Sequence, residues 1–163
     1  MFILYNIFIN IFCLFSKTYL KIRIKNKKEH PERYLEKLSI TNLPANKNRI
    51  IWFHAASVGE LLSIFPLIDK LLRENLFEKI LVTSITLSSS QIFDQKYKNN
   101  EKIIHQFLPI DKSKFIKNFL DHWKPNALVL IESEIWPNLI YETKKKQYTV
   151  DSFECTNYFK NFF

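Results

Sequence analysis

The 163-residue chain is poor in glycine and cysteine: it contains only Gly59, Cys13 and Cys155. So little glycine excludes a collagen-like sequence, a glycine–serine linker and a glycine-rich phosphate-binding loop. One cysteine lies in an apolar run and the other in an aromatic tail, so we expect no disulfide framework. No cysteine–histidine cluster has the spacing of a zinc site, and we expect neither a metal nor a cofactor. The length is that of about one domain.

Acidic residues are missing from the first 28 positions. The same stretch carries six cations directly after the apolar run Phe2–Phe15, at Lys17, Lys21, Arg23, Lys25, Lys27 and Lys28. This order predicts an uncleaved membrane anchor over residues 1–20, which either spans the bilayer or lies in its interface, with the basic flank in the cytoplasm. A helix packed on the domain is the alternative. A basic cluster also suits nucleic acid, but its place beside an apolar run favours a membrane, so we expect no nucleic-acid partner.

Four short apolar runs, at residues 50–54, 80–84, 103–107 and 127–131, alternate with segments of helical period. Strands that alternate with helices predict an α/β fold, a Rossmann-like parallel sheet with helices on both faces. We place this domain at residues 49–147. A basic flank and connector precede it at 21–48, and an aromatic tail at 148–163 shows no helix or strand period.

Ligands of such sheets lie beyond the carboxyl ends of the strands. The first loop there holds Ser57 and Glu60, whose spacing is that of a capping box. A second interpretation is functional. Gly59 would let a ligand approach the backbone, and the helix dipole favours the ionised form of Glu60, as a proton acceptor requires.

Two further loops lie at the same edge. Residues 132–138 carry Glu132 and Glu134 directly after a buried strand, then Pro137 at a predicted helix start. Opposite Glu60 these acids would form an acidic cleft mouth suited to a sugar, whereas a solvated pair of acids is the alternative. Residues 86–90 offer hydroxyls that suit an anion or a simple helix cap.

Two strings in these loops carry a family resemblance. Trp52-Phe53-His54-Ala55-Ala56-Ser57-Val58-Gly59-Glu60 and Glu132-Ser133-Glu134-Ile135-Trp136-Pro137-Asn138-Leu139-Ile140 resemble the amino-terminal half of the 3-deoxy-D-manno-octulosonic acid (Kdo) transferases of lipopolysaccharide assembly. Between them, Phe107-Leu108-Pro109-Ile110-Asp111 and Phe119-Leu120-Asp121-His122-Trp123-Lys124-Pro125 follow in the family's order. The resemblance extends over about residues 1–147.

The resemblance implies the amino-terminal lobe of a two-lobed, B-type glycosyltransferase on the inner membrane. Such an enzyme moves Kdo from CMP-Kdo to the lipid A precursor. Glu60 would be the general base and Glu132 would stabilise the transition state, while Ser57, Gly59, Glu134 and Asn138 would bind the acceptor. The lobe that holds CMP has no counterpart here, so we expect a truncated chain that is inactive alone. The alternative is a membrane-tethered α/β binding module without catalysis.

Overall fold

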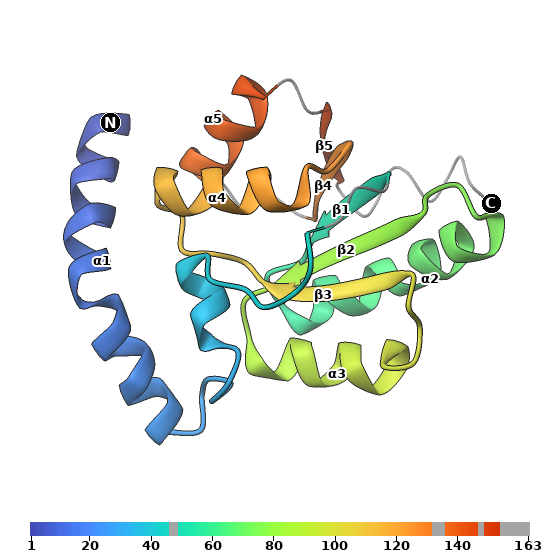
Figure 1. The fold of residues 1–163 in the computed structure, drawn as a ribbon, viewed down its shortest axis with the longest axis horizontal. Coiled ribbons are helices and arrows are strands. Elements are labelled where there is room, and N and C mark those ends of the chain that lie inside the picture. The colour runs from blue at the N-terminus through green and yellow to red at the C-terminus, as the bar shows by residue number, and fades with distance from the viewer. Residues whose placement is uncertain (46–48, 132–135, 147–148, 154–163) are drawn as a thin grey trace.

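A computed structural model describes residues 1–45, 49–131, 136–146 and 149–153. Helices and strands alternate along the folded part of the chain (Figure 1). In order they are α1 (Phe2–Lys25), the 3₁₀ helix η1 (Tyr34–Leu38), β1 (Ile50–His54), α2 (Val58–Glu74), β2 (Lys79–Ser84), α3 (Leu87–Tyr97), β3 (Ile103–Phe107), α4 (Ser113–Trp123), β4 (Ala127–Ile131), α5 (Pro137–Lys145) and β5 (Thr149–Phe153).

The strands form one parallel sheet in the order β3-β2-β1-β4-β5. This confirms the predicted fold class. The four predicted strands are present with boundaries within one residue of those expected. The fifth strand was not predicted: residues 149–153 fall in the segment that we read as lacking a strand period, yet their backbone pairs with β4 from Ala127↔Thr149 to Ile131↔Phe153.

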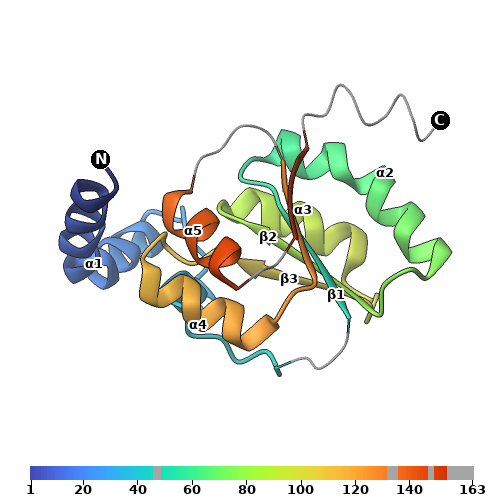
Figure 2. The ribbon, with the colours of Figure 1, turned by 90° about the horizontal axis from the view of Figure 1, so that it is seen from above.

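Alternate residues of the central strand β1 supply the two halves of the core. Ile51 and Phe53 pack with α2 and α3, whereas Ile50 and Trp52 pack with α4 and α5. Helices therefore cover both faces of the sheet (Figure 1, Figure 2). Strands covered on both faces must be apolar throughout, which explains why these segments read as continuous hydrophobic runs.

Helix α1 lies at one side of the domain, outside these layers (Figure 1, Figure 2). It reaches Lys25 and so includes part of the basic flank that we placed after residue 20. By length and apolar composition it is a candidate membrane span. The composition predicted this helix, but it cannot tell whether the helix crosses a bilayer.

The connector after α1 is fastened to the carboxyl ends of β2 and β3. Glu29 is buried and accepts from Lys37 Nζ at 2.6 Å, and the same ammonium donates to the carbonyl of Ile85. Glu36 accepts from the amide of Phe107 at 2.8 Å. An edge strand has unpaired backbone groups that need a partner, so the connector is part of the folded unit rather than a free linker.

Candidate functional site

The strand order locates the crevice at which an α/β sheet binds ligands. From β1 the chain moves outward through β2 and β3, then returns to place β4 on the other side of β1. The loops that follow β1 and β4 therefore diverge, and the space between them is the switch point. His54 pairs with Leu130 at the ends of these two strands. The sequence-predicted residues Ser57, Gly59 and Glu60 follow β1 and Asn138 follows β4, whereas Glu132 and Glu134 lie outside the described residues.

Glu60 adopts the capping geometry at the start of α2. Ser57 Oγ accepts from the Glu60 amide at 3.3 Å and donates to Glu60 Oε1 at 2.7 Å, while Glu60 Oε2 accepts from the Ala56 amide at 2.8 Å. Glu60 is 7% exposed. The capping interpretation is thus confirmed for both residues. Because a carboxylate offers about four lone-pair sites, each oxygen of Glu60 keeps one for a further donor.

Gly59 lies beside this carboxylate with space above it. A methyl group at its Cα would meet no heavy atom closer than Ser57 Oγ, at 4.0 Å. Its φ is not positive, so no backbone strain calls for glycine here. The fold therefore has room for a side chain at position 59.

His54 is a buried neutral base beneath the two loops. Its Nδ1 lies 3.2 Å from the carbonyl oxygen of Thr83 and 3.0 Å from its hydroxyl, and its ring meets Trp136 edge-on at 5.9 Å. Burial lowers its pKa to about 4. Its Nε2 is buried and has no hydrogen-bond partner in the part of the chain that the structure describes. Its contacts with Thr83 fix the position of the ring.

The loop after β4 is organised by a residue to which sequence reasoning gave no role. Asp111 is 1% exposed, and its carboxylate accepts from the amides of Asn138 and Leu139 at 2.9 and 2.8 Å. It thus caps α5 from a distance of 27 residues, at the helix end where the dipole favours an anion. Asp111 stands in one of the strings that carry the resemblance, but its spacing from α5 gives no local signal.

The Asn138 side chain forms hydrogen bonds within the protein. It is 1% exposed, and its side-chain amide donates to the carbonyl of Asp111 at 2.7 Å and to Asn6 Oδ1 at 2.9 Å. Trp136 is half-buried and packs against the α4–α5 side of the core. Pro137 occupies the first turn of α5 as predicted.

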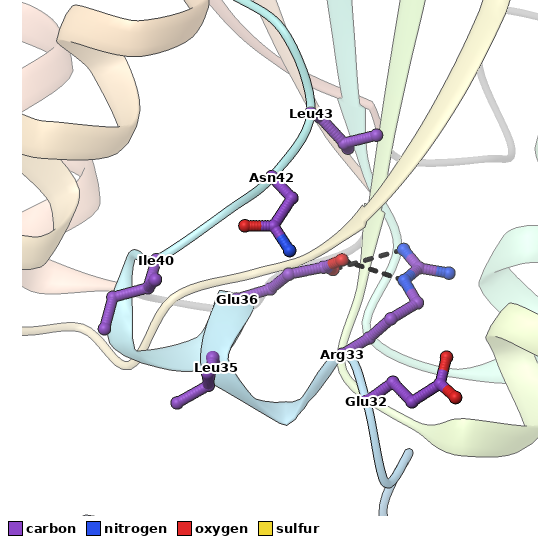
Figure 3. A pocket seen from close by; sticks show the side chains of 7 residues that line it. All are labelled: Glu32, Arg33, Leu35, Glu36, Ile40, Asn42 and Leu43. Carbon is purple, nitrogen blue, oxygen red and sulfur yellow. Dashed lines mark hydrogen bonds and ion pairs between the residues drawn. The ribbon is translucent and has the colours of Figure 1, made fainter.

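The remaining loop and the one pocket described lie away from the switch point. Thr86 caps α3 by accepting from the amide of Ser89 at 3.1 Å, so this loop takes the capping alternative. A pocket of 280 Å³ lies around η1, and it is lined by Glu32, Arg33, Leu35, Glu36, Ile40, Asn42 and Leu43 (Figure 3). Its Arg33 and Glu36 are already paired at 2.8 Å, which leaves this pocket no free charge from that pair.

Residues 29–152 match the family model described as 3-deoxy-D-manno-octulosonic-acid transferase (kdotransferase). A 3-deoxy-D-manno-octulosonic acid transferase of Rickettsia bellii is 40% identical over 126 residues, which are 77% of this chain and 29% of that protein. A probable mitochondrial 3-deoxy-D-manno-octulosonic acid transferase of Arabidopsis thaliana is 36% identical over 69% of this chain and 25% of its own length. The transferase of Rickettsia felis is 46% identical over 57% of this chain. The chain thus spans less than a third of the length of these relatives.

Proposed function

The chain belongs to the family of 3-deoxy-D-manno-octulosonic acid transferases, and from this premise we propose that it forms the acceptor-binding part of such an enzyme. The reaction moves Kdo from CMP-Kdo to the lipid A precursor (lipid IVA) at the cytoplasmic face of the inner membrane. The observation that carries the proposal is the Glu60 carboxylate, which lies at the start of α2 beside the switch point of a domain that matches the family over residues 29–152.

Glu60 acts as the general base in this proposal. One of its free lone pairs accepts the proton of the attacking sugar hydroxyl, whose oxygen bonds to the anomeric carbon of Kdo while the bond to CMP breaks, with inversion. The hydrogen bonds from Ser57 and Ala56 orient the carboxylate in advance, which is what a positioned base requires. Glu132 stabilises the transition state.

The acceptor is bound around this base. Gly59 leaves open space above the first turn of α2, through which a sugar can approach the backbone. Ser57 and Glu134 supply polar contacts beside it, and Asn138 fixes the start of α5. The anchor at residues 1–20 and the basic flank hold the domain at residues 49–147 on the membrane that carries the lipid acceptor.

A second candidate follows from the same geometry. Both oxygens of Glu60 are already hydrogen-bonded and the residue is buried, as a purely structural cap would be. A membrane-tethered binding module would use the same fold and the same helix α1 without any transfer step.

Labelled Kdo transfer from CMP-Kdo to lipid IVA separates the two candidates. The chain is assayed alone and together with the separately expressed part of the Rickettsia bellii transferase that lies beyond the matched segment. We expect transfer in the mixture and a 10²- to 10⁴-fold loss with Glu60→Gln. Glu74→Gln, which changes an exposed carboxylate at the other end of α2, is the matched control. No transfer in any mixture would favour the binding module, and transfer unaffected by Glu60→Gln would remove the base from the mechanism.

A further inference from the structure

The outer face of α1 carries most of the exposed large apolar side chains among the described residues. Of the fifteen exposed large apolar side chains there, eleven lie between Met1 and Ile22. Phe2, at the start of the helix, is the least exposed of these. The others within the helix recur every three or four residues: Ile3, Leu4, Ile7, Phe8, Ile11, Leu14, Phe15, Tyr19 and Ile22. An exposed apolar face of this extent marks a site of interaction.

The opposite face of α1 is partly buried, and its N-terminal end contacts the domain. The buried and half-buried positions lie mostly three or four residues apart: Tyr5, Asn6, Ile9, Phe12, Cys13, Ser16, Leu20, Arg23 and Ile24. Near the N-terminus the Tyr5 hydroxyl donates to Asp111 Oδ2 at 2.6 Å, and the Phe2 ring packs on Tyr141 at 5.3 Å. At the other end Arg23 Nε donates to Glu29 at 3.3 Å.

These contacts decide how the helix can meet a bilayer. Its 24 residues are about 36 Å long at ~1.5 Å per residue, enough to cross a hydrocarbon core of about 30 Å. A crossing helix, however, has its two ends on opposite sides of the membrane. Here the N-terminal end contacts Asp111 and Asn138 of the domain, and the other end continues into the connector, where Arg23 pairs with Glu29. The docked helix therefore cannot cross.

The charges identify the surface that covers the apolar face. All the lysines of α1 and of the turn that follows it are exposed: Lys17, Lys21, Lys25, Lys27 and Lys28. No acidic residue occurs before Glu29. These lysines follow the apolar stretch, at the carboxyl end of the helix. Each cation near an anionic leaflet contributes about 1 kcal/mol to binding, so this end favours an anionic membrane surface.

We infer that α1 binds a bilayer containing anionic lipids as an in-plane helix, inserted into one leaflet while Tyr5 and Asn6 keep it docked on the domain. This rests on the membrane attachment in the proposed function and fixes its geometry. Asp111 and Asn138, which receive the helix, follow β3 and β4 at the carboxyl edge of the sheet. The in-plane helix therefore holds the edge that carries the candidate site against the membrane surface.

Crosslinking within vesicle-bound protein tests this geometry. Phe2→Cys with Tyr141→Cys is made in a chain whose own cysteines are serine, and bound to vesicles of phosphatidylcholine and phosphatidylglycerol. We expect a bismaleimide to link the pair as efficiently as it does without lipid. Phe8→Cys with Tyr141→Cys, which starts from the outer face, is the matched control and should not link. The variant Tyr5→Phe should lower the yield about fivefold through the lost hydrogen bond, whereas Tyr19→Phe should not.

Protease access gives a second, independent readout. An epitope with a cleavage site is added before Met1, and protease is supplied outside sealed vesicles. Complete removal of the epitope supports the in-plane helix. An epitope protected until detergent is added, together with loss of the Phe2–Tyr141 crosslink, would overturn it and leave membrane attachment intact. If the chain fails to sediment with vesicles, or associates with itself instead of binding them, both the in-plane geometry and the membrane attachment are overturned.

Discussion

Two buried carboxylates serve helix starts at the same edge of the sheet, and they differ in the reach of their contacts. Within the described part of the chain, the Glu60 carboxylate bonds to residues no more than four positions away, Ala56 and Ser57. Asp111 accepts from residues 27, 28 and 106 positions away, and so joins α5 and α1 to the loop after β3. Asp111 therefore holds three elements together, whereas the contacts of Glu60 organise a single loop and helix start.

Replacing Glu60 tests the first half of this contrast and has the largest expected effect. In the complemented transfer assay Glu60→Gln should cost 10²- to 10⁴-fold in rate. Because glutamine also serves in a capping box, the free energy of unfolding in urea should change by less than about 1 kcal/mol. If the free energy of unfolding falls by as much as the lost rate corresponds to in free energy, Glu60 is a structural residue like Asp111.

Replacing Asp111 tests the second half. In Asp111→Asn an amide nitrogen displaces one of the two acceptor oxygens, so buried donors at the start of α5 lose their partner. Hydrogen bonds to a charged group contribute about 1.5–3 kcal/mol each, and we expect the free energy of unfolding to fall by about 3 kcal/mol or more in urea titrations. Asp121→Asn provides the control, since this exposed carboxylate pairs only with Lys146. If Asp111→Asn is as stable as Asp121→Asn, Asp111 is no more important for folding than Glu60.

Lowering the pH adds a further test, because it protonates His54, which lies beneath the loops that follow β1 and β4. Burial lowers the pKa of His54 to about 4, from an ordinary value near 6.5, so below pH 6.5 protons bind the unfolded chain first. The contribution of His54 to the free energy of unfolding should therefore be constant above pH 6.5 and fall by up to about 3 kcal/mol between pH 6.5 and 4. His105, whose pKa burial also lowers, acts in the same direction. Urea titrations against pH measure this, and a His54→Asn variant with an unreduced slope would exclude His54 as its source.

The smallest effect on folding is expected at Gly59. Since a methyl group there meets nothing closer than 4.0 Å, Gly59→Ala should leave thermal unfolding unchanged or raise the midpoint slightly. If an acceptor sugar passes over this position, the same variant should raise KM for lipid IVA in the complemented assay. Unchanged kinetics would show that the open space is not used.

Local features were predictable from the sequence and distant ones were not. The apolar runs gave β1 to β4, and the Ser57–Glu60 spacing gave the cap, because each depends on neighbours in the chain. The last strand was missed because Asp151 and Ser152 interrupt its apolar character. The bond from Tyr5 to Asp111 joins positions 106 residues apart, and no periodicity reports such a contact. For the same reason the sequence analysis assigned Asp111 no role in the candidate site.

That long separation also sets an order of events during synthesis. The ribosome releases α1 first, while Asp111 and Asn138 emerge more than a hundred residues later. At about 5–20 residues per second, the delay lasts roughly 5–20 s. Throughout that interval α1 cannot dock on the domain, because the residues that receive it have not yet been made.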